Sequence, residues 1–137
     1  MEIDDFRFRL DVEVEIGDTD LGGVVYYGRY ARFVDAAAVA YRRQLGLPPL
    51  GPDGHLFVVR RLEIEYLSSA RFGDTVQVGV RTTKVGHTSH ELEALLVRDG
   101  RPVASARAVI VGVERYGGRP SRFPAGLADA IRAFEGL

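Results

Sequence analysis

The amino-acid sequence predicts an α+β fold in which one long helix covers a curled antiparallel sheet. Three observations support this prediction: an alternating segment near the N-terminus, an amphipathic segment after it, and four further strand-like segments joined by short turns. Alternation with period two indicates a strand with one wet face, whereas apolar residues every three to four positions indicate a helix. Because each element must bury its apolar face, the helix is expected to cover one face of the sheet. Strands of this length twist, so the sheet is expected to wrap around the helix.

The first strand and the helix are defined by their periodicity. The strand is predicted over Phe6 to Ile16, where apolar and charged residues alternate. The helix is predicted over Tyr26 to Gln44, where aromatic and aliphatic residues recur at helical spacing and several alanines permit close approach to a sheet. Gly46, followed by Pro48 and Pro49, is expected to end the helix.

The second half of the chain has the pattern of an antiparallel meander. A loop rich in glycine and proline is predicted over Leu50 to His55, and it is followed by four predicted strands: Leu56 to Leu67, Thr75 to Val85, Ser89 to Arg98 and Val103 to Arg115. Turn signals separate them, of which Asp99-Gly100 is a strong hairpin dipeptide. A short terminal helix is predicted over Ala125 to Phe134. Because no repeat or linker interrupts the pattern, residues 1–137 are predicted to form one domain.

Composition excludes several classes of function. The net charge is −1, with 18 basic and 19 acidic residues, which argues against binding nucleic acid. The chain has no cysteine, so disulfides, thiolate metal sites and a cysteine nucleophile are excluded. The N-terminus is acidic where a signal peptide is basic, and no apolar run is long enough to span a membrane. We therefore expect a soluble cytoplasmic protein.

The segment from Gly17 to Tyr27 is the most informative part of the sequence. It places Asp18 and Asp20, then Gly22 and Gly23, directly before the predicted helix. The start of a helix has unpaired backbone N–H groups and a partial positive charge. A carboxylate beside such donors is a minimal arrangement for attack on a polarised carbonyl group.

This segment resembles the opening motif of the 4-hydroxybenzoyl-CoA thioesterase family, which includes the Tol–Pal-associated acyl-CoA thioesterases. The similarity covers roughly Phe6 to Arg115 and is carried by these stretches: Asp18 to Tyr27 with Tyr30 and Asp35, Val58 to Leu67, Ala70 to Asp74, and Gly86 to Ser89. The resemblance implies a hotdog fold and hydrolysis of an acyl- or aryl-CoA thioester to a carboxylic acid and free coenzyme A. It implies no cofactor, since coenzyme A is part of the substrate. It also implies a homodimer or homotetramer with sites between subunits, which would cover exposed sheet edges.

The resemblance assigns the chemistry to the loop and the helix start. Asp20 is implied to act as a nucleophile or as a general base that activates water, and the sequence leaves both open. Its alternative is a turn or helix-capping residue. Asp18 is better explained as a residue that holds the loop by an Asx-turn bond. The backbone N–H of Tyr27 is implied to polarise the carbonyl group. Gly22 and Gly23 let the backbone approach a ligand, or form a plain tight turn, and Val24 is assigned to substrate binding.

Further residues are assigned to substrate binding with structural alternatives beside them. Tyr30 would contact the substrate or pack in the core, and Asp35 would reach the acyl pocket or remain an exposed helix carboxylate. Arg60 and the turn residues His87, Thr88 and Ser89 would contact coenzyme A, or form an ordinary polar surface. The three histidines lack the spacing of metal ligands, so no metal site is expected.

Two other functions fit the same residues. The first is hydrolysis of a thioester on an acyl-carrier protein in a polyketide or fatty-acid pathway, because the pantetheine arm is common to both substrates. The second, from another class, is a non-catalytic acyl-CoA-binding module. The presence of Asp20 argues against the second function, and the balanced charge shows no basic docking face for a carrier protein.

Overall fold

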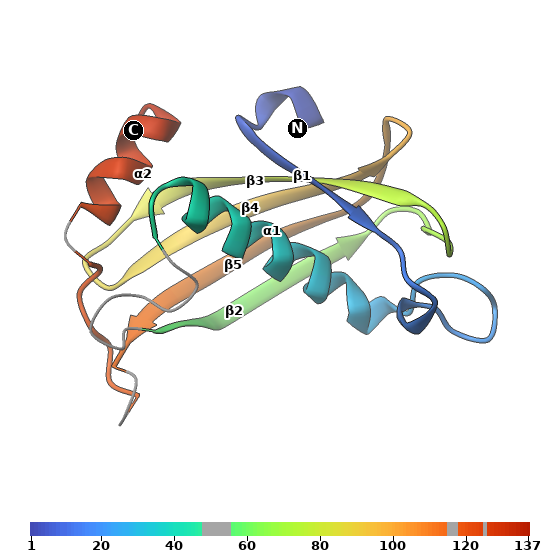
Figure 1. The fold of residues 1–137 in the computed structure, drawn as a ribbon, viewed down its shortest axis with the longest axis horizontal. Helices are drawn as coiled ribbons and strands as arrows, with labels where there is room; N and C mark the ends of the chain where they lie inside the picture. The colour runs from blue at the N-terminus through green and yellow to red at the C-terminus, as the bar shows by residue number, and fades with distance from the viewer. Residues whose placement is uncertain (48–55, 115–117, 125) are drawn as a thin grey trace.

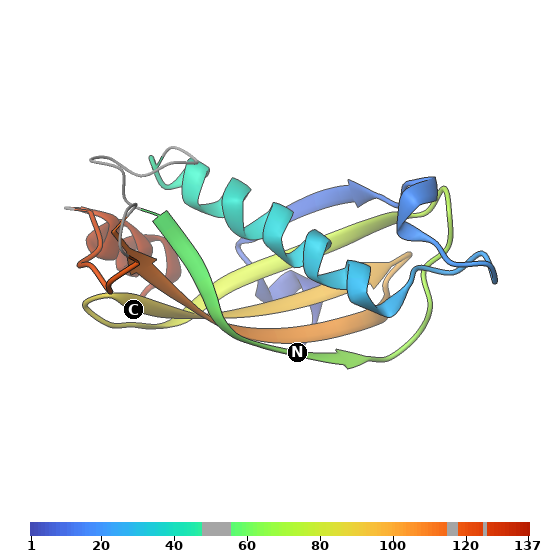
Figure 2. The same cartoon turned by 90° about the horizontal axis from the view of Figure 1, so that it is seen from below.

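The computed structural model describes residues 1–47, 56–114, 118–124 and 126–137, and its centre is a five-stranded antiparallel sheet (Figure 1). In chain order its elements are η1 (Ile3–Asp5), β1 (Phe8–Glu13), η2 (Ile16–Asp18), η3 (Tyr27–Arg29), α1 (Tyr30–Gln44), β2 (Leu56–Tyr66), β3 (Thr75–Val85), β4 (Ser89–Arg98), β5 (Arg101–Val113) and α2 (Leu127–Glu135). Figure 2 shows α1 lying against one face of the curled sheet. The predicted α+β class, with a sheet curled around one long helix, is confirmed.

Most strands lie where periodicity placed them, and β3 and β4 have the predicted bounds. β1 is shorter than predicted because the residues on both sides of it leave the sheet. Phe6 packs on the face away from α1, against Leu95 and Val97. A Cβ atom on Gly79 would lie 2.7 Å from Phe6 Cγ, so glycine at this position makes room for the ring. Ile16 begins η2 and is exposed.

The strand order is β1-β3-β4-β5-β2, which corrects one prediction. β3, β4 and β5 form the expected meander, and Asp99 and Gly100 have φ values of 49° and 74°, as a type I′ hairpin turn requires. The prediction that β2 continues this meander is wrong, because β2 pairs with β5 at the far edge. The connection of residues 67–74 is too long for a tight hairpin and instead crosses the end of the sheet, where Leu67 N–H donates to Val103 O at 2.9 Å. β1 and β2 are therefore the two edge strands.

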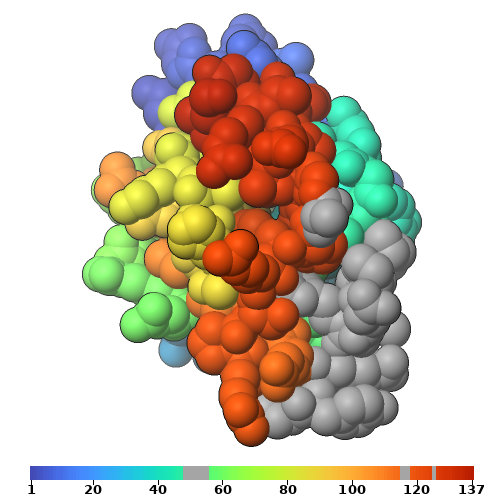
Figure 3. All heavy atoms as spheres, turned by 90° about the vertical axis from the view of Figure 1, so that its left-hand side faces the viewer, coloured from blue at the N-terminus to red at the C-terminus, as the bar shows by residue number. Residues whose placement is uncertain are grey.

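The core lies between α1 and the inner face of the sheet. The buried residues of α1 include Phe33, Ala37, Ala38 and Tyr41, and the small alanines allow the helix to approach β1 and β3 closely. α2 covers the end of the molecule next to the β3–β4 turn (Figure 3).

Some predicted features fall on residues outside the described ranges: Pro48, Pro49, the loop from Leu50 to His55, Arg115 and Ala125. Within the described residues, no helix is long and apolar enough to cross a membrane.

Candidate active site

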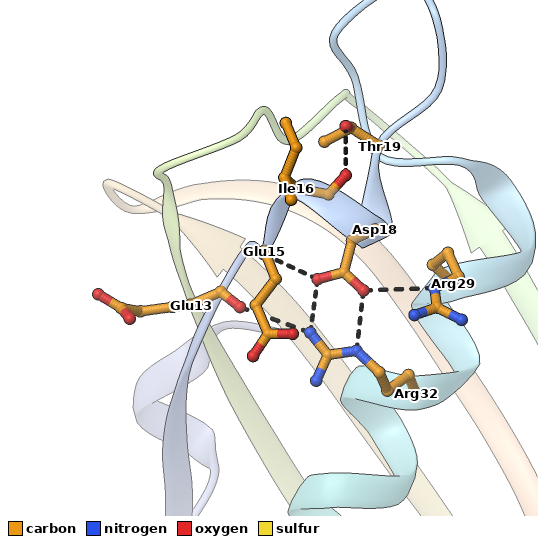
Figure 4. A network of polar contacts seen from close by, with 7 residues as sticks. All are labelled: Glu13, Glu15, Ile16, Asp18, Thr19, Arg29 and Arg32. Atoms are coloured by element: carbon orange, nitrogen blue, oxygen red, sulfur yellow. Dashed lines mark hydrogen bonds and ion pairs between the residues drawn. The ribbon is translucent and has the colours of Figure 1, made fainter.

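One buried carboxylate connects the loop before α1 to the helix itself (Figure 4). Asp18 is 0% exposed, and its Oδ1 accepts hydrogen bonds from Arg32 Nε at 2.9 Å and from Arg29 Nε at 3.3 Å. Its Oδ2 accepts hydrogen bonds from Arg32 Nη2 and from the backbone N–H of Glu15. Because Arg32 lies in the first turn of α1, this cluster fixes the loop against the start of the helix.

The charge of Asp18 is stabilised by these donors. Burial by itself would raise the pKa of the carboxyl group, because the protein interior solvates an ion poorly. The hydrogen bonds from Arg32, from Glu15 N–H and from Arg29, together with the charge of Arg32, outweigh burial and hold the pKa below its usual value. Asp18 therefore holds the loop, but not by the expected Asx-turn bond: its backbone donor is Glu15 N–H, three residues earlier, and its other donors are arginines that the motif did not indicate.

Asp20 lies at an exposed position in the turn that follows. Its Oδ1 accepts the N–H of Gly22 at 2.8 Å, its own N–H donates to Val24 O at 2.9 Å, and its carbonyl accepts Gly23 N–H at 3.1 Å. Gly23 has a φ of +78°, which a residue with a side chain rarely adopts. Among the described residues, Oδ2 of Asp20 has no hydrogen-bond partner. The turn thus holds the carboxylate by one oxygen and leaves the other accessible.

The start of the helix offers donors near this loop. η3 continues directly into α1, and Tyr26 N–H donates to Asp18 O at 2.9 Å. Within the described part of the chain, the N–H groups of Tyr27 and Gly28 have no acceptor, as expected for the first turn of a helix. These free donors can bind a developing negative charge.

Tyrosines connect the helix start to the edge strand β2. Tyr66 donates its hydroxyl hydrogen to Tyr27 O at 3.0 Å, and its ring centroid lies 6.3 Å from that of Tyr27 and 5.5 Å from that of Tyr30. Tyr30 is buried, and its hydroxyl accepts Ala70 N–H at 3.3 Å. Within one chain, Tyr30 therefore has the packing role that was the alternative to substrate contact.

Comparison with known proteins gives the family. The model of the thioesterase superfamily matches residues 22–105. The chain belongs to the thioesterase superfamily. It is 31% identical over 123 residues to the acyl-CoA thioesterase YbgC of Haemophilus influenzae, a match that covers 88% of this chain and 90% of the relative. It is 29% identical over 120 residues to the acyl-CoA thioester hydrolase YbgC of Escherichia coli O6:H1, with 85% and 90% coverage. The predicted family is confirmed, and the chain is a thioester hydrolase.

Solved structures agree with the fold of this thioesterase. A thioesterase of Thermus thermophilus, solved with coenzyme A and zinc, is 34% identical and superposes with a TM-score of 0.79 over 96% of each chain. The PA5185 protein of Pseudomonas aeruginosa is 26% identical, with a TM-score of 0.88 over 98% of this chain and 95% of that chain. These neighbours support the hotdog fold.

Within one chain of this thioesterase, most of the predicted site residues lie at the two opposite ends of the sheet. Asp20, Gly22, Gly23, Val24 and Tyr27 are at the end of the sheet where β1 meets the start of β3. The turn residues His87, Thr88 and Ser89 lie at the opposite end, beside α2 (Figure 1). β3 has 11 residues, so the two ends are roughly 33 Å apart at about 3.3 Å per residue. A single chain does not bring these groups together.

The other two predicted residues are exposed between those ends. Asp35 lies on α1 and Arg60 at the irregularity in β2, where the register with β5 shifts between Val59 and Arg61. Within the described ranges, neither forms a hydrogen bond or an ion pair with the Asp20 loop. Their contact with substrate stays a prediction.

Sequence reasoning missed a buried polar chain beneath α2. Glu135 Oε2 accepts hydrogen bonds from Thr82 N–H at 2.6 Å and from the Tyr41 hydroxyl at 2.8 Å. Thr82 Oγ1 lies 2.9 Å from the Tyr41 hydroxyl and 3.1 Å from Nδ1 of His90, which is 1% exposed. Burial raises the pKa of the Tyr41 phenol well above its usual value. The available signal was the alternation of β4: His90 is in phase with the buried Leu92 and Ala94, so its side chain is on the core face.

A groove lies on the face of the sheet that points away from α1. It is an open groove of about 480 Å³ that includes none of the predicted site residues and is lined largely by charged side chains of β2, β4 and β5, among them Arg61, Glu63, Glu91, Glu93 and Arg107. Among the described residues, no group of three or more histidine or acidic side chains is placed to hold a metal ion.

Proposed function

We propose that this thioesterase hydrolyses an acyl-CoA thioester to a carboxylic acid and free coenzyme A, with Asp20 as the reacting carboxylate. The observation that carries the proposal is the anchored loop: it presents an accessible carboxylate oxygen of Asp20 close in sequence to a helix start with free N–H groups. The name of the Haemophilus influenzae relative and the coenzyme A in the Thermus thermophilus structure support the choice of thioester.

The proposed reaction uses the two groups together. The N–H of Tyr27 binds the thioester carbonyl oxygen and stabilises the negative charge that develops on it; the loss of one such donor typically raises the barrier by roughly 3 kcal/mol. Asp20 then either attacks the carbonyl carbon, so that the C–S bond breaks and an acyl-aspartyl anhydride awaits water, or it takes a proton from an attacking water molecule. In both routes the thiolate of coenzyme A leaves and takes up a proton. Gly22, Gly23 and Val24 shape the turn that holds the carboxylate.

The substrate test is a panel of thioesters monitored by the release of free thiol. We expect turnover of coenzyme A esters when short, medium, long and aryl acyl groups are compared, and the preferred acyl group emerges from the ratio of kcat/KM values. The same acyl groups on an acyl-carrier protein form the second arm. If kcat/KM is about tenfold higher for the carrier-protein thioester than for the coenzyme A thioester, the carrier-protein thioester is the substrate. Binding of esters without turnover of any would instead support the non-catalytic module.

We further propose that the complete site needs a second copy of this chain, paired along β2. β2 is an edge strand, and three apolar residues on its inner face are partly uncovered: Val59 is 52% exposed, Leu62 37% and Tyr66 48%. A two-fold axis across an antiparallel β2–β2 pair would set the Tyr66 end of one chain beside the Leu56 end of the other. It would therefore bring the end that carries His87 to Ser89 toward the Asp20 end of the partner. It would also cover an edge that is otherwise open to aggregation.

Lysine at the two sheet edges tests this arrangement. Leu62→Lys places a charge in the proposed interface and is expected to shift the protein from dimer or tetramer toward monomer, with loss of thioesterase activity. Asp11→Lys places the same side chain on the exposed face of β1, the opposite edge, and is the matched control. Light scattering after size-exclusion chromatography gives the mass. A wild-type monomer at working concentration, or an unchanged mass of Leu62→Lys, would contradict the proposal.

A further inference from the structure

The ion-pair cluster of Figure 4 joins the two segments that carry the proposed reacting groups. Asp18 lies two residues before Asp20, and Arg32 lies five residues after Tyr27. The guanidinium group of Arg32 holds both oxygens of Asp18 through Nε and Nη2, a bidentate geometry that fixes orientation as well as distance. Nη2 also lies 3.5 Å from Glu13 O, so the same group reaches the end of β1.

We propose that Arg32, acting through Asp18, is a positioning residue that sets the place of the Asp20 carboxylate relative to the N–H groups at the start of the helix; this inference rests on the proposed function. Arg32 does not contact the exposed Asp20 turn. It acts on the backbone: Asp18 O accepts Tyr26 N–H at 2.9 Å, so a shift of Asp18 moves the residue next to Tyr27 as well.

The burial of Asp18 strengthens its ion pair with Arg32. Its carboxylate is 0% exposed, while the Arg32 side chain is 34% exposed and Arg29 is 46% exposed. Water therefore reaches the arginine but not the carboxylate, so the attraction between the two charges is screened less than in a surface ion pair. Arg29 supplies a single longer contact of 3.3 Å, which places it second to Arg32.

The effect of losing this clamp is expected in kcat. A displacement of about 1 Å between reacting groups can reduce the rate by roughly 100-fold. We therefore expect Arg32→Gln to lower kcat by roughly 10- to 100-fold. Because Arg32 lies outside the proposed substrate contacts, KM should stay within about threefold. Arg32→Lys keeps the charge but loses the bidentate geometry, and we expect a kcat between those of the wild type and Arg32→Gln.

Arg81→Gln is the matched control. Arg81 also forms an ion pair with a partly buried carboxylate, Glu93 at 3.1 Å, with side-chain exposures of 31% and 18%, and it lies on β3 away from the loop. We expect this variant to retain the wild-type kcat.

Two further readouts separate positioning from a purely structural role. Hydrogen exchange of residues 19–27 should accelerate in Arg32→Gln and remain unchanged in Arg81→Gln. In an Asp20→Asn background, Arg32→Gln should leave the residual rate unchanged, because its effect passes through the carboxylate that is already lost. If Arg32→Gln does not fold, Arg32→Lys carries the same three measurements.

The outcomes show separately whether the inference or the proposed function fails. Wild-type kcat in Arg32→Gln, an equal loss of rate in the Asp20→Asn background, or unchanged exchange of residues 19–27 would overturn the inference. If the wild-type protein hydrolyses no thioester, the proposed function fails. Faster exchange in Arg32→Gln would in that case still support Arg32 as the residue that sets the loop, and unchanged exchange would overturn that too.

Discussion

Asp20→Asn is expected to lower the kcat of thioester hydrolysis by roughly 100- to 10,000-fold, the range by which a positioned acid or base accelerates a reaction. Asparagine is the sharpest substitution here. Its Oδ1 can still accept the Gly22 N–H that Asp20 accepts at 2.8 Å, so the turn is preserved while the carboxylate is lost. The measurement is thiol release on the preferred acyl-CoA ester, together with the dissociation constant of a non-hydrolysable analogue.

Asp20→Ala is the companion variant, since it removes both the carboxylate and the Asx-turn acceptor. We expect an equal loss of kcat and, in addition, a lower melting temperature. In the wild type, a burst of free thiol ahead of acid release would favour Asp20 as nucleophile over Asp20 as general base. A kcat of Asp20→Asn within a few-fold of the wild type would remove Asp20 from the reaction.

The second large effect is a loss of stability in mild acid that originates at His90. This side chain is buried on the inner face of β4, its Nε2 has no hydrogen-bond partner among the described residues, and burial, with the nearby charge of Arg42, lowers its pKa from 6.5 to about 3. Below pH 6.5 the unfolded chain binds a proton at this residue and the folded chain does not. The free energy of unfolding therefore falls as the pH decreases from about 6.5 towards 3.

The size of this effect follows from the proton linkage. Each pH unit in that window reduces the free energy of unfolding by up to about 1.4 kcal/mol, so a change from pH 6.5 to 4.5 should cost about 2 kcal/mol. Urea denaturation at several pH values measures it. The measured range, pH 6.5 to 4.5, lies above pH 4. Protonation of Asp18, whose pKa is held below its usual value, adds its own loss of stability only below that pH.

His90→Leu should flatten this pH dependence. Leucine removes the titrating group and the unpartnered Nε2. It also removes the hydrogen bond of Nδ1 to Thr82 Oγ1, but that hydroxyl keeps Tyr41 as a partner, so stability at pH 7 should change by about 1 kcal/mol or less. His87→Gln, in the exposed turn before β4, is the matched control and should keep the wild-type slope. A slope of His90→Leu equal to that of the wild type between pH 6.5 and 4.5 would show that the acid loss arises elsewhere.

The parts of the fold that the sequence predicted well are local. The bounds of β3 and β4, the hairpin at Asp99 and Gly100 and the end of α1 at Gln44 follow from periodicity and turn chemistry, which act over a few residues. The predicted helix start at Tyr26 instead leads into the 3-10 turn η3, and α1 begins at Tyr30. The position of β2 was mispredicted because its partner is chosen by long-range pairing. Short connections favour neighbours, but the eight residues after β2 permit another edge.

The candidate site divides in the same way. The motif of Asp18, Asp20, two glycines and a helix start is local in sequence. It was enough to predict the family and the candidate reacting groups. The arginine partners of Asp18 lie 11 and 14 residues away, and Glu135 reaches Thr82 across 53 residues. No spacing rule predicts such contacts, because they form only when the helices pack against the sheet. Only the tertiary structure decided which carboxylate is locked in the interior, which remains open to solvent, and that one chain keeps its two groups of predicted site residues at opposite ends of the sheet.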